Sequence, residues 1–313
     1  MNATAAAKRI LVAGEINVDL VFKGCRTLPE PGREVLADDF VMTPGSSSMI
    51  CAMGLARLGD PVAFHGKLGA DSWGDFCLGA LRGAGIDTAT LRPDPVLRTG
   101  ITASLSTPQD RALVTFAGAI GALRESDVTD AMLAQADHLH VSSYYLQRGL
   151  RPDCRALCAR ARAAGCTISL DPGFDPERLW GLDLVDVLRE VDVFLPNEEE
   201  LLAITGTREL GRALHALGNG RTLTVVKRGR AGCATLHEGR LLEVPAFAVA
   251  AVDSTGAGDS FDAGFLHAWL RGWPLHECLR WGSACGSLST RAVGGTPGQA
   301  DAGEVQALLE AAP

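Results

Sequence analysis

The distribution of apolar and polar residues changes character near residue 126. Beyond that point, short apolar runs alternate with segments whose apolar residues recur at helical spacing. This alternation predicts a mostly parallel sheet whose strands are joined by helices that cover both of its faces. The predicted strands are 10–14, 61–69, 138–142, 166–171, 191–196 and 222–227 with a hairpin at 231–245, and the predicted helices are 47–59, 72–84, 126–135, 151–164, 182–190, 197–204, 208–217, 258–271, 274–290 and 301–311.

Four extended segments in the first part of the chain fall outside this rhythm. They lie near residues 20–23, 35–42, 99–107 and 111–116. Because no helix separates them regularly, we expect them to pair into a small sheet of their own. This sheet would be a β lid, made of residues about 15–45 and 97–120, within one domain that spans residues 1–313.

Composition narrows the class of protein. The 313 residues carry a formal net charge of −8 and a sequence pI of about 5.4. No basic face is indicated, so we expect neither nucleic acid nor a membrane as a partner. The N-terminus lacks a signal-peptide pattern, and the nine cysteines lack metal-site spacing. We therefore expect a cytoplasmic protein with reduced, packed thiols.

The strongest chemical signal is the segment DSTGAGDSFDAGF at 253–265. Gly256, Ala257 and Gly258 are small residues that come just before an apolar helical stripe. Small residues allow a ligand to approach the backbone, and a helix start presents N–H groups and the positive end of the helix dipole. The loop therefore predicts an anion site suited to a phosphoryl group.

Asp259 is the unusual member of this loop, because a carboxylate in an anion site should repel a phosphate. Its position makes chemical sense if it accepts a proton from a hydroxyl group that attacks that phosphate. The alternative is that Asp259 only caps the helix, since aspartate is a favoured N-cap residue.

This segment resembles the C-terminal signature of the ribokinase-like (PfkB) carbohydrate kinases. The resemblance implies that Asp259 is the catalytic base and that amides of the Gly256–Gly258 loop form the anion hole for the γ-phosphate of ATP. Asp262 stands where many members carry asparagine. The resemblance also implies a ribokinase-like α/β fold, with a central mostly parallel sheet, helices on both faces and a small β lid.

Two N-terminal segments resemble the family's sugar-binding elements. GEINVDL at 14–20 contains Asn17 and Asp19. A carboxylate can accept hydrogen bonds from two neighbouring hydroxyl groups, which suits a polyol. The segment PGSSS supplies Gly45, Ser46 and Ser47, which we expect to line the same sugar.

The chain departs from the family's pattern at two of these positions. Ser46 replaces the second glycine, and Ile50 stands where most members place an asparagine near the sugar. The serines would either compensate for the lost polar contact or cap the helix that follows.

The remaining candidates concern the metal and the nucleotide. LPNEEEL resembles the family's N-x-x-E element, which implies that Asn197 and Glu200 hold Mg²⁺ largely through water; an acidic first helical turn is the alternative. Asp253 with the Gly294–Gly295 loop is a candidate site for a monovalent cation such as K⁺. The residues expected along the nucleotide are Lys227, Gly229, Gly232, Ser254 and Ser283.

The sequence is thus interpreted as an ATP-dependent kinase that phosphorylates a primary hydroxyl of a sugar or sugar-like polyol and that forms a homodimer contact through the lid. Ribose, fructose, a 2-keto-3-deoxy sugar acid and a nucleoside all remain open as substrates. A nucleoside kinase of the same family and a non-catalytic sugar- or nucleotide-binding regulator are the alternatives. A dinucleotide-dependent dehydrogenase is excluded, because the first turn is GEINVD and not GxGxxG.

Overall fold

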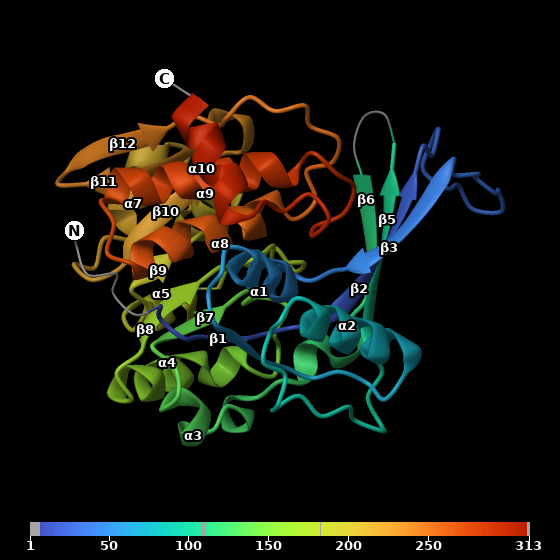
Figure 1. Ribbon diagram of the computed structural model, residues 1–313, viewed down its shortest axis with the longest axis horizontal. Coiled ribbons are helices and arrows are strands. Elements are labelled where there is room, and N and C mark those ends of the chain that lie inside the picture. The colour runs from blue at the N-terminus through green and yellow to red at the C-terminus, as the bar shows by residue number, and fades with distance from the viewer. Residues whose placement is uncertain (1–6, 108–110, 182, 312–313) are drawn as a thin grey trace.

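The computed structural model describes residues 7–107, 111–181 and 183–311. Its centre is an eight-stranded sheet in the order β12-β11-β10-β9-β8-β7-β1-β4 (Figure 1). The strands from β10 to β4 are parallel, and the hairpin β11–β12 adds two antiparallel strands at one edge. The bounds are β1 Ile10–Ala13, β4 Val62–His65, β7 His138–Val141, β8 Thr167–Leu170, β9 Val193–Phe194, β10 Leu223–Lys227, β11 Cys233–His237 and β12 Arg240–Val244.

Helices cover both faces of this sheet, as the alternating pattern predicted. Ile10 and Val12 of β1 contribute to one core and Leu11 and Ala13 to the other, because successive strand residues point to opposite faces. The first core includes α1 Ser47–Arg57, α2 Ser72–Gly83, α8 Ala257–Leu270, α9 Leu275–Ser289 and α10 Ala302–Ala311. The second includes α3 Asp130–Leu133, α4 Cys154–Ala163, α5 Asp183–Leu188, α6 Glu198–Thr205 and α7 Leu210–Ala216.

One predicted helix is much shorter than expected. The range 126–135 contains a 3-10 turn at Glu125–Asp127 and only a single α-helical turn, α3. Val128 between them has ψ near 100°, and Thr129 caps the second piece by accepting from the Met132 N–H at 3.4 Å. The local capping bond at Thr129 therefore starts a new helix where the apolar spacing had suggested a continuous one.

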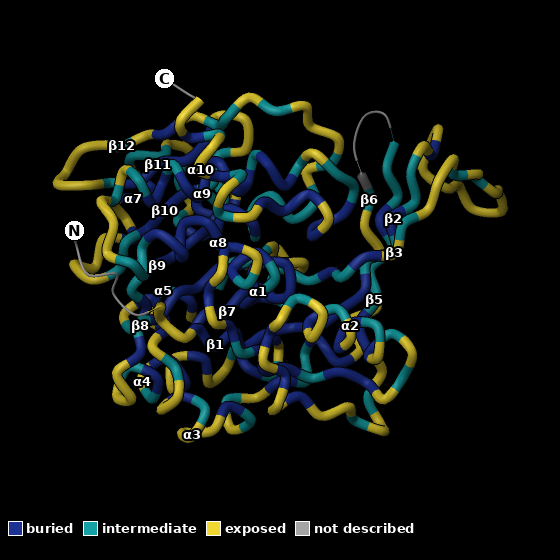
Figure 2. The backbone as a smooth tube through the Cα atoms, in the orientation of Figure 1, coloured by how far each residue is buried: buried dark blue, intermediate teal, exposed yellow. Residues whose placement is uncertain are grey.

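The extended segments form a separate four-stranded sheet, which confirms the predicted lid strands. The order is β3-β2-β5-β6, with β2 Asn17–Lys23, β3 Asp39–Pro44, β5 Gly100–Ser106 and β6 Arg111–Phe116. This sheet projects from one side of the body, and its backbone is mostly half-buried or exposed (Figures 1 and 2).

All nine cysteines are buried as free thiols. Among the described residues, no helix combines the length and the apolar character needed to cross a bilayer.

Helices α8 and α9 pack closely enough to require a glycine at their crossing. A Cβ atom at Gly264 would lie 2.6 Å from the Trp281 carbonyl oxygen and 2.8 Å from Cβ of Cys285. Such distances are far below van der Waals contact, so a side chain here would separate the two helices. The crossing matters for the site because α8 carries Asp259 near its N-terminal end.

We predict that Gly264→Val lowers the free energy of unfolding by at least about 1–3 kcal/mol, as overpacking of a close-packed core typically does. Urea denaturation followed by circular dichroism would measure it. Gly79→Ala on α2 is the matched control, since a Cβ there has no neighbour within 4 Å. The control should be neutral or slightly stabilising, because alanine favours a helix over glycine. A Gly264→Val variant as stable as the wild type would contradict the packing described here.

Candidate active site

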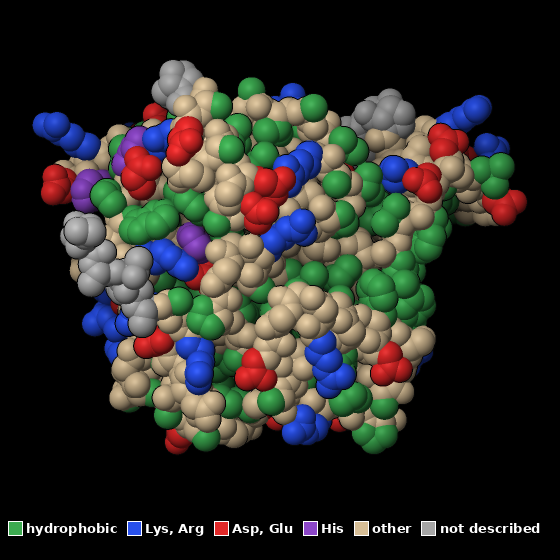
Figure 3. Space-filling view, viewed as in Figure 1, with side chains coloured by type: hydrophobic (Ala, Val, Ile, Leu, Met, Phe, Trp, Pro, Cys, Tyr) green, Lys and Arg blue, Asp and Glu red, His purple; other side chains and the backbone are tan. Residues whose placement is uncertain are grey.

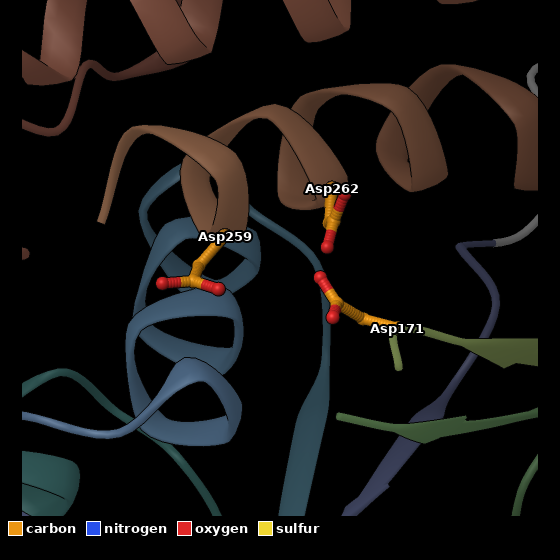
Figure 4. Close-up of side chains that lie close together, drawn as sticks. All are labelled: Asp171, Asp259 and Asp262. Atoms are coloured by element: carbon orange, nitrogen blue, oxygen red, sulfur yellow. The ribbon is translucent and has the colours of Figure 1, made fainter. Parts of the chain in front are cut away.

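The candidate active site lies at the N-terminus of helix α8. Gly256 is the N-cap residue and Asp259 stands in the first turn (Figure 4). The N–H of Ala257 donates to the Ser254 carbonyl at 3.2 Å, so the loop itself engages this amide. The N–H groups of Gly258 and Asp259 are the next two backbone donors in the first turn of the helix.

Gly256 is fixed as glycine by two independent constraints. Its φ angle of 70° is left-handed, which strains any residue with a side chain. An added Cβ would also lie 2.6 Å from Cα of Gly295 and 3.1 Å from Cγ2 of Ile50. The loop before α8 thus lies directly against the loop at 294–296 and against helix α1.

The Asp259 carboxylate occupies an environment that weakens its acidity. Burial, followed by the nearby charge of Asp171, raises the pKa of Asp259 to about 7. The ammonium of Lys227 and a hydrogen bond from the Ser47 side chain act in the opposite direction. A carboxyl group that titrates near neutral pH is suited to general-base catalysis.

Lys227 is bound by carboxylates inside the protein. Its Nζ donates to Oδ2 of Asp171 at 2.6 Å and to both oxygens of Asp262 at 3.0 and 3.1 Å. The three side chains are almost entirely buried. Figure 4 shows Asp171, at the end of β8, directed toward Asp262 on α8. Lys227 was expected along the nucleotide, and the structure directs its amine to these two carboxylates.

The Lys227 ammonium forms ion pairs with two carboxylates in this cluster. Oxygens of Asp171, Asp259 and Asp262 lie within 4.8 Å of one another. Burial opposes the charge on Lys227, yet Asp171 and Asp262 raise the pKa of its ammonium. Burial acts against ionisation of Asp171 as well, but Lys227 holds the pKa of that carboxyl below its usual value. For Asp262, burial dominates and raises the pKa well above the usual range.

Two acids of the site escaped the sequence analysis. Asp171 follows strand β8 directly, and Glu15 follows the turn after β1. Glu15 is buried and accepts from the hydroxyl of Ser48 and, at 3.3 Å, from its N–H. The available signal was an acid within two residues of the end of a buried strand, because the carboxyl ends of parallel strands meet at one edge of the sheet.

The residues predicted for the sugar lie together at the base of the lid. Asn17 donates from Nδ2 to Oδ1 of Asp19 at 3.0 Å and to the Thr102 hydroxyl at 3.1 Å. A Cβ at Gly45 would collide with the Asp19 carboxylate and lie 2.8 Å from Nδ2 of Asn17. Gly45 is therefore needed where the backbone entering α1 passes Asp19 on β2.

Ser46 has a structural role in the described contacts. It is the N-cap residue of α1, where its hydroxyl accepts from the Met49 N–H at 2.9 Å and donates to the Glu15 carbonyl at 2.8 Å. Its φ angle of 67° is the left-handed value that a glycine would adopt without strain. Ser46 was expected either to replace a lost polar contact to the sugar or to cap the helix, and its hydrogen bonds support helix capping. The Ser47 side chain instead interacts with the Asp259 carboxylate.

Asn197 and Glu200 form a capping box at the start of α6. The Glu200 N–H donates to Oδ1 of Asn197, and the Asn197 N–H donates to Oε2 of Glu200, both at 2.8 Å. Burial, followed by the charge of Asp171, raises the pKa of Glu200 to about 7. Asn197 thus orients a buried carboxylate next to the Asp171–Asp262 cluster, and one oxygen of that carboxylate is held by the capping bond.

The residues predicted for the nucleotide are more scattered in their roles. The Ser283 hydroxyl is buried and donates to the Pro245 carbonyl at 2.8 Å. A Cβ on Gly232 would collide with the backbone of Val244 and Pro245, so the close approach of these two segments requires a glycine here. Gly229 has a left-handed φ of 54° with open space where a Cβ would be, and so leaves room for a ligand.

Asp253 does bring together the two loops expected around a monovalent cation. Its Oδ2 accepts from the Gly294 N–H at 2.9 Å, and its Oδ1 accepts from the N–H and hydroxyl of Thr255. The two carboxylate oxygens therefore hold the 253–256 loop against the 294–296 loop.

Comparisons with known proteins identify the class. Residues 7–301 match the family described as pfkB family carbohydrate kinase. An ATP-dependent ribose-1-phosphate kinase of Halopiger xanaduensis is 31% identical, over 90% of this chain and 91% of its own. The structure of Arabidopsis thaliana ribokinase complexed with ribose and ATP has a TM-score of 0.84 at 26% identity, covering 97% of this chain and 99% of its own. A protein from E. coli assigned as a ribokinase II, in complex with ATP and Mg²⁺, has a TM-score of 0.84 at 24% identity, covering 97% and 100%.

The chain belongs to the pfkB family of carbohydrate kinases. The predicted resemblance, the ribokinase-like fold and the predicted enzyme class are all confirmed: the protein is a phosphotransferase with an alcohol group as acceptor.

We predict that Lys227→Met costs about 3–5 kcal/mol of stability at neutral pH, because it leaves buried carboxylates without their counter-ion. The deficit should shrink toward about pH 5 and grow toward about pH 8, since a carboxyl whose folded-state pKa is raised takes up a proton more readily when folded. Denaturant titrations at several pH values would measure this.

Lys23→Met is the matched control for this substitution. Lys23 pairs with Asp39 at 3.0 Å on the exposed part of the lid. Loss of an exposed pair should cost less than about 1 kcal/mol with little pH dependence. Equal, small effects of the two substitutions would mean that the buried ammonium is not needed for stability.

Proposed function

We propose that this protein is an ATP-dependent kinase that transfers the γ-phosphate to a primary hydroxyl of a neutral sugar or sugar-like polyol. One observation carries the proposal: a carboxylate with a pKa near 7, Asp259, stands in the first turn of a helix whose N-terminal amides and dipole favour phosphate. A base and a phosphoryl site in one helical turn suit a hydroxyl nucleophile.

In this proposal, each group of the turn has one task. Asp259 accepts the proton of the acceptor hydroxyl as its oxygen forms the new bond to the γ-phosphorus, and the bond to the β-phosphate oxygen breaks to release ADP. The amides of Gly258 and Asp259 stabilise the charge that develops on the phosphoryl oxygens. The hydroxyl of Ser47 holds the base in its orientation.

The acidic residues of the site fit a divalent cation. Burial, followed by the charge of Asp171, raises the pKa values of both Glu200 and Asp259, and a cation bound nearby would favour the ionised forms of these carboxyl groups. Oxygen ligands are those that Mg²⁺ prefers. Glu200, oriented by Asn197, would hold the ion through water, and the ion would neutralise charge on the phosphates. The Mg²⁺–ATP complex of the E. coli fold neighbour supports this assignment.

Asp253 with Gly294 and Gly295 remains a proposed site for K⁺. The nucleotide would lie along the regions 227–232 and 282–296, with Gly229 and Ser254 near it. The ATP complex of the Arabidopsis relative supports ATP as the phosphate donor.

The lid face that carries Asp19 supports a neutral acceptor. Strand pairing places Thr43, Asp19, Thr102 and Thr115 in one row across all four strands. This row offers acceptors and hydroxyl groups, and neither it nor the neighbouring row of Val21 contains a lysine or arginine among the described residues. An anionic substrate would face Asp19 and Glu15 without a compensating charge, so ribose, fructose or a nucleoside fits better than a sugar acid.

The opposite lid face supports the proposed homodimer. It presents apolar side chains whose exposed fractions are high for a monomer, including Phe40 at 50%, Met42 at 40%, Val114 at 65% and Phe116 at 45%. Hydrophobic side chains gather on the lid side of the molecule (Figure 3). The same apolar face on a second copy would cover them, as in an isologous interface.

We predict that Asp259→Asn lowers kcat by about two orders of magnitude or more, while ATP affinity holds or improves. Asparagine keeps the size of the residue, but it accepts no proton at neutral pH. ADP release measures kcat, and calorimetry measures ATP affinity.

The pH dependence of the wild type gives the matching control. The value of kcat/KM should fall as pH drops below about 7, because only the ionised Asp259 accepts a proton. Gly256 and not Asp259 is the N-cap residue of α8, so the helix-cap alternative is wrong. If Asp259 only stabilised the first helical turn through the helix dipole, its replacement would change stability by at most about 1 kcal/mol and turnover would hardly move.

We predict that Asp19→Ala raises the acceptor KM at least tenfold with ATP KM nearly unchanged, since a hydrogen bond to a charged group contributes about 1.5–3 kcal/mol. Asp39→Ala, on the distal end of the same lid, is the control and should leave both KM values unchanged. An unaltered acceptor KM in a folded Asp19→Ala variant would refute the assignment of Asp19.

We predict that ribose, fructose or adenosine gives a higher kcat/KM than ribose 1-phosphate or 2-keto-3-deoxygluconate. A coupled ADP-release assay over this panel would measure it. A preference for either anion would overturn the neutral-acceptor assignment and leave the kinase class intact. Acceptor-dependent binding heat without turnover would favour a non-catalytic regulator.

A further inference from the structure

Ile50 is the departure from the family's pattern that the proposed chemistry does not use. It lies in the first half of helix α1 and is only 3% exposed. Its side chain packs on backbone at two glycines. The methyl Cγ2 lies 3.1 Å from the position of a Cβ on Gly256, and Cγ1 lies 2.8 Å from the position of a Cβ on Gly295.

These contacts place Ile50 between the two loops that frame the anion hole. All three heavy atoms nearest to a Cβ on Gly295 belong to Ile50, and its Cδ1 overlaps that position. Gly295 in turn limits Gly256 through its Cα and carbonyl oxygen. The isoleucine side chain therefore fills the space that side chains at the two glycines would otherwise occupy.

The start of this helix and the backbone that enters it lie on the acceptor side of the site. Ser47, one turn before Ile50, contacts Asp259, and Gly45 adjoins Asp19. The backbone of Ile50 is held as well, because its carbonyl accepts from Nε2 of Gln299 at 2.7 Å. Helix α1 thus contacts the base and the anion-hole loop, and Gly45, in the backbone that enters the helix, adjoins Asp19.

We propose that Ile50 is a positioning residue. Its apolar side chain, which extends from α1, packs against the Gly256 loop and fixes the position of that loop. The loop in turn fixes the amides of Gly258 and Asp259 where they contact the phosphoryl group in transfer. Ile50 acts through the loop and not on the acceptor. The proposal rests on the proposed function, because it assumes that these amides bind the phosphoryl group.

The lid shares this arrangement through the 294–296 loop. Thr43 on β3 lies 3.3 Å, hydroxyl to hydroxyl, from Thr296, and a Cβ on Gly294 would lie 2.8 Å from its Cγ2. Ile50 and Thr43 therefore contact the loop from two sides. Removal of the Ile50 side chain leaves a gap that the loop can move into, since the structure around a new cavity relaxes part of the way into it.

The test uses ADP with and without aluminium fluoride, a planar mimic of a phosphoryl group in transfer. Calorimetry on the wild type should show that aluminium fluoride tightens ADP binding. In Ile50→Ala this tightening should fall by about tenfold or more, as expected when anion-hole donors are displaced, while affinity for ADP alone and the acceptor KM stay within about twofold. Leu55→Ala, from the buried core face of the same helix, is the control for lost volume and should keep the full tightening.

A size swap separates positioning from simple loss of stability. Gly295→Ala adds one carbon where Cδ1 of Ile50 lies and should reduce kcat, whereas Ile50→Val removes that carbon. The double variant should recover most of the kcat lost by Gly295→Ala, because contacting residues couple non-additively. Additive losses in the double variant would overturn the proposal.

This experiment distinguishes failure of the proposed phosphoryl site from failure of the proposed role of Ile50. If wild-type ADP binding is not tightened by aluminium fluoride, the proposed phosphoryl site itself is wrong. If the wild type tightens and Ile50→Ala tightens equally, only the role of Ile50 is wrong. A raised acceptor KM with normal tightening would place Ile50 in contact with the acceptor instead, and would also overturn the proposal.

Discussion

The rest of the site depends on one buried ion cluster, the Lys227 ammonium between Asp171 and Asp262. These residues come from β10, the end of β8 and the second turn of α8, so the cluster ties the helix to the carboxyl edge of the sheet. Burial of such charges is costly unless each is paired. The pairing therefore restricts where α8 can lie. Asp259, one turn earlier on the same helix, receives its position and much of its electrostatic environment from these neighbours.

Close backbone approach then determines the geometry around this fixed helix. Gly264 allows α9 to cross α8, Gly54 allows α1 to approach α8 at Ala263, and Gly256 meets Gly295. At each of these glycines the absence of a side chain lets the neighbouring segment pack directly against the backbone. This close packing leaves little freedom for the amides at the start of α8. A site of this kind needs few catalytic groups, since phosphoryl transfer depends mainly on position and charge.

Local signals made most of this site predictable, and non-local contacts account for what was missed. The glycine loop, Asp259, Asp19 and the lid strands were readable because their spacing is contiguous or periodic. Asp171 and Glu15 carry no motif of their own. The sequence placed Lys227 along the nucleotide, and its ion pairs with Asp171 and Asp262 could not be predicted because both partners are distant in sequence. Ser46 had two interpretations, and the choice needed the Met49 and Glu15 bonds. The short α3 reflects a cap at Thr129 that competes with apolar spacing.

Ser46 and Ile50, the two departures from the family's pattern at the start of α1, together fix the position of this helix. Ser46 caps the helix and binds the Glu15 carbonyl, which fixes the helix start beside β1. Ile50, one turn later, contacts the loops at Gly256 and Gly295. A polar residue at position 50 would be buried against glycine backbone and would need hydrogen-bond partners there. An isoleucine needs no such partners and only has to fit the space between the two loops. The helix therefore uses polar contacts where it meets the acceptor side and apolar packing where it meets the phosphoryl side, so that recognition of the acceptor and placement of the anion hole depend on the same rigid element.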